Sequence, residues 1–143
     1  KAVGEAWNWR VVPASLDAQN PAAADLFATA GKAALMPMSP VRASGKRTAD
    51  GITLQWVRRA RVNADSWGVA EIPLDESEES YEIEILSGVS VKRVLTATGP
   101  TVLYPAALEL ADFGGQQTSL SVRIFQMSVS VGRGHRLEAL ISL

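Results

Sequence analysis

The sequence predicts an all-β fold, a sandwich of seven short strands preceded by an N-terminal arm. From Val41 onward, runs in which apolar and polar residues alternate recur between turn-forming residues, which is typical of a β-sandwich. The 143 residues suffice for one hydrophobic core. Because the chain has no cysteine, its stability must come from packing and not from disulfides or thiolate metal sites.

Four segments show the strand pattern clearly. In residues 51–59 the apolar side chains alternate through to Trp56, and residues 81–86 repeat the pattern, with Glu82 and Glu84 expected to face water. The other two clear strands are residues 120–124 and 137–143. The side chains expected in the core are Trp56, Tyr81, Ile83, Val122 and Ile124.

Weaker patterns complete the set of strands. Residues 41–46, 89–96 and 101–104 bring the total to seven. Residues 104–114 break the alternation, with helix formers between a proline and a glycine, and predict a short helix between two late strands that buries Leu108 or Phe113.

The first 38 residues differ in composition and predict an N-terminal arm or linker with one or two short elements, followed by the sandwich at 39–143. Trp7 and Trp9 belong to a strand-like run, and we expect them to pack on the sandwich or on an upstream domain. A helix or a loop beginning near Asn20 follows. Prolines 37 and 40 favour a boundary, and the first residue, Lys1, suggests a piece of a longer polypeptide.

Composition excludes several classes of function. Fourteen basic and fifteen acidic residues give a formal charge of −1, so no global field attracts nucleic acid. Apolar runs are too short to span a bilayer, for which roughly 20 residues are needed.

Four segments resemble the strands of fibronectin type III domains, namely Pro40-Val41, Gly51 to Trp56, Tyr81 to Ile85 and Leu120 to Ile124. In that family a tryptophan of the second strand lies in the core, which is the place of Trp56 in this resemblance. The sequence departs from that family at Leu120, where an aromatic residue is usual.

A second resemblance covers nearly the whole chain and rests on short motifs in order. These motifs are similar to the C-terminal region of large tail proteins of gene transfer agents and related phages. They are Trp9 to Pro13, Trp56 to Arg61, Asp65 to Trp67, Ile72 to Leu74, Asp112 to Gly114 and Val131 to Gly134. The resemblance implies a structural or adhesive module of a tail tip or baseplate, made in the bacterial cytoplasm and extracellular after release. Its implied partners are other tail subunits or a cell-surface glycan or receptor.

Two functions of different classes follow. The first is a non-catalytic interaction module, and the second is a carbohydrate-binding accessory domain of an upstream hydrolase. We expect no enzyme activity and no cofactor, because the single histidine, His135, has no cysteine or second histidine to complete a metal site, and no nucleophile elbow is present.

Two groups of residues are candidates for interaction. Arg58, Arg59 and Arg61 could grip phosphate or an acidic glycan, or could pair with Glu78, Glu79 or Glu82 on a neighbouring strand. Trp67 could stack on a sugar, contact a subunit or cover the core.

The other candidate is a glycine-rich segment near the C-terminus. Residues 131–135, with Arg133 and His135 beside two glycines, predict a loop that holds the guanidinium toward solvent, either for recognition or simply as a turn.

Overall fold

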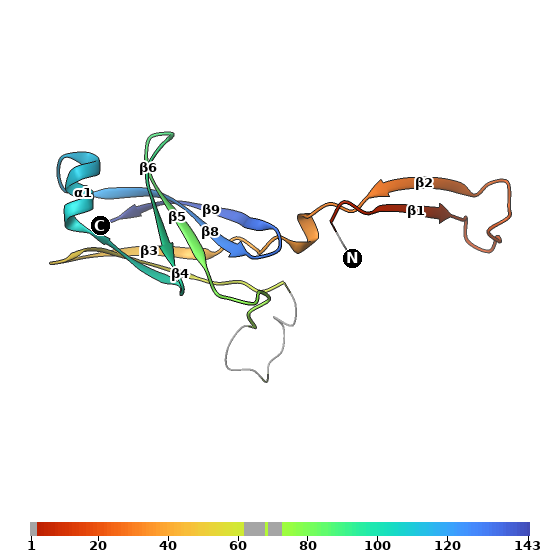
Figure 1. Cartoon of the computed structure of the whole chain (residues 1–143), viewed down its shortest axis with the longest axis horizontal. Coiled ribbons are helices and arrows are strands. Elements are labelled where there is room, and N and C mark those ends of the chain that lie inside the picture. The colour runs from red at the N-terminus through yellow and green to blue at the C-terminus, as the bar shows by residue number, and fades with distance from the viewer. Residues whose placement is uncertain (1–2, 62–67, 69–72) are drawn as a thin grey trace. The chain divides into compact units, whose positions relative to one another are not determined.

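Figure 1 shows a computed structural model of the chain, which describes residues 3–61, 68 and 73–143. The chain divides into two compact units, Lys1–Leu35 and Met36–Leu143. Within the second unit, the Pro37 carbonyl accepts a 2.9 Å hydrogen bond from the backbone N–H of His135, in the last strand.

The second unit is an all-β sandwich of two antiparallel sheets, which lie face to face in Figure 1. The three-stranded sheet has the order β3 (Val41–Thr48), β4 (Gly51–Val57), β7 (Thr101–Pro105). The four-stranded sheet has the order β6 (Ser90–Ala97), β5 (Tyr81–Ser87), β8 (Ser119–Ser128), β9 (Gly132–Ser142). These are the seven strands that the alternating pattern predicts, with β8 and β9 longer than expected.

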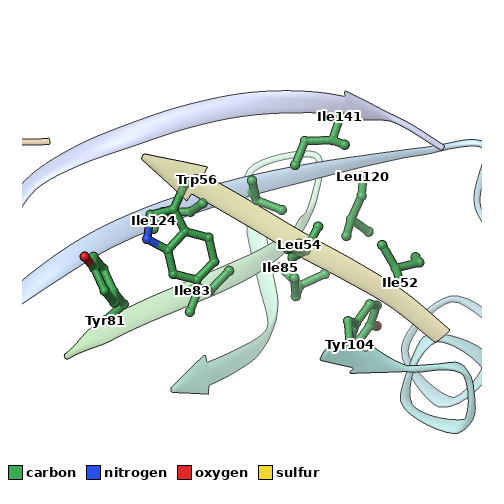
Figure 2. Close-up of a cluster of buried hydrophobic side chains, with 11 residues drawn as sticks. Ile52, Leu54, Trp56, Tyr81, Ile83, Ile85, Tyr104, Leu120, Ile124 and Ile141 are labelled. Carbon is green, nitrogen blue, oxygen red and sulfur yellow. The ribbon is translucent and has the colours of Figure 1, made fainter. Parts of the chain in front are cut away.

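The core lies between the two sheets. The five side chains expected there are buried, with Trp56 4% exposed and Tyr81, Ile83, Val122 and Ile124 fully buried. Figure 2 shows how side chains of the two sheets meet, and the Trp56 and Tyr81 rings pack edge to face with centroids 5.1 Å apart. Edge-to-face packing is favourable because the positive edge of one ring meets the negative face of the other.

Helix α1 (Ala106–Phe113) joins β7 to β8, as predicted. Gly114 ends it in the left-handed conformation, at φ 75°, and its N–H bonds the Leu110 carbonyl. Leu108 and Phe113 are partly buried against the core.

Two carboxylates tie this helix to both sheets. Glu109, only 1% exposed, accepts hydrogen bonds of 2.8 and 2.9 Å from Arg47 of β3. Asp112 accepts bonds of 2.6 and 2.7 Å from Arg93 of β6. These arginine hydrogen bonds lower the pKa of both carboxyl groups, against the opposing effect of burial.

The first unit is a hairpin of β1 (Ala6–Val11) and β2 (Ala24–Thr29), followed by a short 3-10 helix, Ala33–Leu35. The helix considered near Asn20 is not formed. The Asn20 side chain instead accepts a 3.0 Å bond from the Ala22 N–H, which makes a turn before β2, the local geometry that favours asparagine in loops.

Candidate functional site

One face of the β1–β2 hairpin is apolar along its whole length. In the antiparallel register Trp7 lies opposite Ala28, Trp9 opposite Leu26 and Val11 opposite Ala24. Directly paired residues share one face of a sheet, and so do residues two apart on a strand. The six side chains of this apolar face are therefore Trp7, Trp9, Val11, Ala24, Leu26 and Ala28.

The two tryptophans form an aromatic pair on the apolar face. Their ring centroids lie 6.3 Å apart at an interplanar angle of 30°. Beside them lies a shallow hollow of about 200 Å³, whose lining consists of both indoles and residues 28–30. Trp9 is 52% exposed and Leu26 54% exposed, so the Trp9 ring and the Leu26 side chain are open to a partner, whereas Trp7 is half-buried.

The opposite face of the hairpin is more polar. Arg10 and Asp25 lie directly across from each other and form an ion pair of 3.3 Å. Asn8 lies opposite Phe27, which is 77% exposed and is the one large apolar side chain on this face of the two strands. The hairpin therefore has two chemically different faces.

An uncovered apolar face is costly for such a small element. A two-stranded hairpin alone is only marginally stable in water. Each Å² of apolar surface removed from water contributes about 25 cal/mol to stability. A partner that covers the two tryptophans and the leucine would therefore stabilise the hairpin, and the same buried surface would contribute to the binding free energy. Large aromatic residues are also the side chains that most often dominate the binding energy of protein interfaces.

The basic run at residues 58–61 is largely engaged with neighbouring groups. Arg58 pairs with Glu79 at 3.3 Å, and Arg61 pairs with Glu76 at 3.0 Å. Arg59 donates to the carbonyl and hydroxyl oxygens of Ser39, at 2.8 and 3.0 Å.

Arg58 does pair with one of the glutamates named above, Glu79, but the two residues do not lie on neighbouring strands. The strands β4 and β5 belong to different sheets, so Arg58 and Glu79 pair in the connection between the sheets and not across a strand ladder.

Arg133 does not project from a loop. The turn ends at Gly132, where φ is 79°, and Arg133 is the second residue of β9. Its guanidinium pairs with Glu82 at 2.6 Å and with Glu84 at 2.7 Å, and lies 4.6 Å from the centroid of the Phe125 ring. The arginine belongs to the outer surface of the four-stranded sheet.

These contacts also correct the expectation that Glu84 faces water. Glu84 is 7% exposed because Arg133 covers it from β9 and Arg123, at 3.6 Å, covers it from β8. Arg123 also forms an ion pair with Glu138 at 2.7 Å, and Glu138 forms another with Arg136 at 3.4 Å. The outer ion-pair network therefore comprises three glutamates and three arginines, Glu82, Glu84, Glu138, Arg123, Arg133 and Arg136.

The second glycine of the 131–135 segment has a packing role. A Cβ at Gly134 would lie 2.7 Å from the Pro37 carbonyl oxygen and 2.9 Å from that of Gln126. The adjacent His135 is exposed, and its backbone makes the bond to Pro37. Trp67, the remaining candidate, lies outside the described residues.

A search of the described residues finds no group of three or more His, Cys, Asp or Glu side chains placed to hold a metal ion. The only α-helix in the described ranges, eight residues long, is not of the length and apolarity that crossing a membrane requires.

Sequence reasoning missed the second half of the apolar face. Residues 24–29 do alternate, with Ala24, Leu26 and Ala28 on one side, but alanine is a weak strand former and the nearby Asn, Asp and Pro residues indicated a loop. The tryptophans alone therefore stood out.

No family model and no curated protein matches the chain. Among solved structures, the chain is similar to the crystal structure of the rat CD45 extracellular region, domains d3-d4, at 16% sequence identity and a TM-score of 0.49. The alignment covers 100% of this chain and 67% of that chain. At this level of similarity the comparison assigns no function.

Proposed function

We propose that the chain is a non-catalytic interaction module that binds another protein subunit through the apolar face of its hairpin. The observation that carries the proposal is the aromatic pair Trp7 and Trp9, which lies with Leu26 on one continuous and partly exposed face. The rigid sandwich serves as the scaffold, since its own core is formed without these residues.

The biological setting belongs to the same proposal. The ordered motifs that resemble gene transfer agent and phage tail proteins support a place in a tail tip or baseplate. The partner is then a neighbouring tail or baseplate subunit, which offers an apolar surface to the tryptophans, or a host surface receptor.

A pair of matched substitutions tests this function. Trp9→Ser removes an aromatic side chain from the apolar face, whereas Phe27→Ser removes one from the opposite face of the same hairpin. The measurement is the amount of the protein retained in purified particles, alongside the thermal unfolding of the isolated chain. We expect Trp9→Ser to reduce retention by at least about tenfold, a loss of about 1.4 kcal/mol, and Phe27→Ser to leave it near wild type. Equal retention of the two variants would contradict the proposed face.

One observation favours a second function, carbohydrate binding. The outer surface of the three-stranded sheet has a hollow of about 410 Å³ lined by Arg42, Gln55 and other polar and apolar groups. This hollow belongs to the sandwich and the apolar face belongs to the hairpin, so different substitutions test the two functions independently.

A further inference from the structure

The three-stranded sheet has an unusual distribution of charge. Its strands β3, β4 and β7 contain three basic residues, Arg42, Lys46 and Arg47, and no acidic residue. Arg47 is neutralised by Glu109 of the helix. In the described part of the chain, no carboxylate pairs with Arg42 or Lys46, in contrast to the fully paired arginines of the outer ion-pair network.

Arg42 is held on this surface by a distorted backbone. Its φ is 53°, in the left-handed region that side chains other than glycine rarely adopt. The residue lies in a β-bulge, where the pairing of β3 with β4 shifts between Val41 and Ser44. Bulges re-aim side chains, and strained residues of this kind concentrate at binding sites.

Three polar residues lie in a row across the sheet, next to Arg42. Ser44 lies opposite Gln55, which lies opposite Thr101 on the other side. All three line the hollow of about 410 Å³ together with Arg42, and its remaining lining is Trp56, Val57 and Pro100. The Thr101 hydroxyl donates to the Leu54 carbonyl at 3.1 Å, so its oxygen is left to accept a hydrogen bond.

We propose that this hollow, the Arg42 site, binds the carboxylate-bearing ring of an acidic saccharide. The guanidinium is a planar donor whose N–H groups match the two oxygens of a carboxylate. The hydroxyl and amide groups of Ser44, Gln55 and Thr101 match sugar hydroxyls, and Val57 and Pro100 offer apolar surface to the C–H faces of the ring.

The position of the hollow argues against an extended acidic peptide as the ligand. A peptide strand adds to a sheet through an unpaired edge. The hollow lies over β4, and both edges of β4 are already paired, with β3 and β7. An acidic saccharide needs no free backbone edge.

The test is a titration of the isotope-labelled chain with a uronic acid oligosaccharide, followed by NMR of the backbone amides. The neutral glucose oligosaccharide and a poly-glutamate peptide serve as ligand controls. We expect saturable shifts in β3 and β4 near the bulge with the uronic acid ligand alone, at millimolar affinity or better. Absence of saturable shifts, or equal shifts with poly-glutamate, would overturn the proposal.

Substitutions separate the site from general charge attraction. Arg42→Ala should weaken binding of the uronic acid oligosaccharide by at least about tenfold. Lys92→Ala removes one exposed positive charge from β6, in the other sheet, and should leave binding within about twofold. Equal losses in the two variants would show non-specific attraction and overturn the site.

A third variant protects the test against misfolding. Arg42→Gly relieves the positive φ, so it should raise the thermal midpoint while still abolishing binding. Retained binding in this stabilised variant would also overturn the proposal.

Discussion

Replacing Arg133 with alanine should destabilise the sandwich, although the sequence alone predicts a loop that holds this arginine toward solvent. The guanidinium makes two close ion pairs, to Glu82 and to the 7%-exposed Glu84, and lies over the Phe125 ring. Its removal leaves Glu84 with only the longer 3.6 Å pair to Arg123.

The magnitude follows from those contacts. Exposed ion pairs contribute about 0.2–1 kcal/mol each, and an exposed cation–π contact about 0.5–1 kcal/mol. The arginine side chain is itself 42% exposed, so solvent screening reduces the sum. We therefore expect Arg133→Ala to lower the free energy of unfolding by about 1–2 kcal/mol.

Urea denaturation at low and at high salt measures this effect. Arg136→Ala is the matched control, because Arg136 is 58% exposed and makes one ion pair of 3.4 Å, so its loss should cost no more than about 0.5 kcal/mol. High salt should narrow the difference between Arg133→Ala and wild type. If Arg133→Ala unfolded at the wild-type midpoint in low salt, the outer ion-pair network would contribute nothing measurable and the reasoning would be refuted.

Three further predictions test the sandwich. Trp56→Ala removes a 4%-exposed indole and should cost about 3–5 kcal/mol, so a near wild-type denaturation midpoint would mean that the core is wrongly placed. Gly51→Ala should destabilise the fold more than Gly88→Ala does, because a Cβ at Gly51 would lie 2.2 Å from the Tyr104 carbonyl oxygen. A Cβ at Gly88 would meet nothing within 4 Å. Equal denaturation midpoints of the two variants would contradict this prediction. The pKa of Glu109 is below its ordinary value of 4.5, so its contribution to stability is present above about pH 4.5 and is lost as the pH falls through the lowered value in the folded state. Glu109→Gln should therefore reduce the loss of unfolding free energy between about pH 4.5 and lower pH, measured by denaturation at a series of pH values. An unchanged dependence on pH in this acidic range would show that the Glu109 carboxylate does not contribute.

Strand alternation predicted the sandwich well because burial between two sheets imposes a period of two on each strand. Trp56 and Tyr81 illustrate this, since each lies on the inner face that the pattern indicates. The same pattern failed for Glu84, because alternation reports which face a side chain occupies and not what covers that face. The cover comes from Arg133 and Arg123, on strands far along the chain.

The candidate site was only half predictable. Trp7 and Trp9 are visible in the sequence as an alternating aromatic pair, but their partner strand contains alanines, whose weak strand preference gives no clear signal. The role of Gly134 was equally hidden in the sequence. Two nearby glycines indicate a turn, but glycine is required at position 134 because a Cβ there would clash with the Pro37 carbonyl oxygen. Both depend on pairing between distant segments.

The most direct test of the hairpin as a binding surface uses two consecutive residues on its opposite faces. A photo-crosslinking amino acid is placed at Leu26, on the apolar face, or at Phe27, on the polar face, of the protein in the tail particle in which the proposal places it. The proposal predicts that the probe at Leu26 crosslinks to a second protein, identified by mass spectrometry as a tail or baseplate subunit, and that the probe at Phe27 does not. Crosslinks from Leu26 only to residues 36–143 of the same chain, or equal crosslinking from both positions, would contradict it.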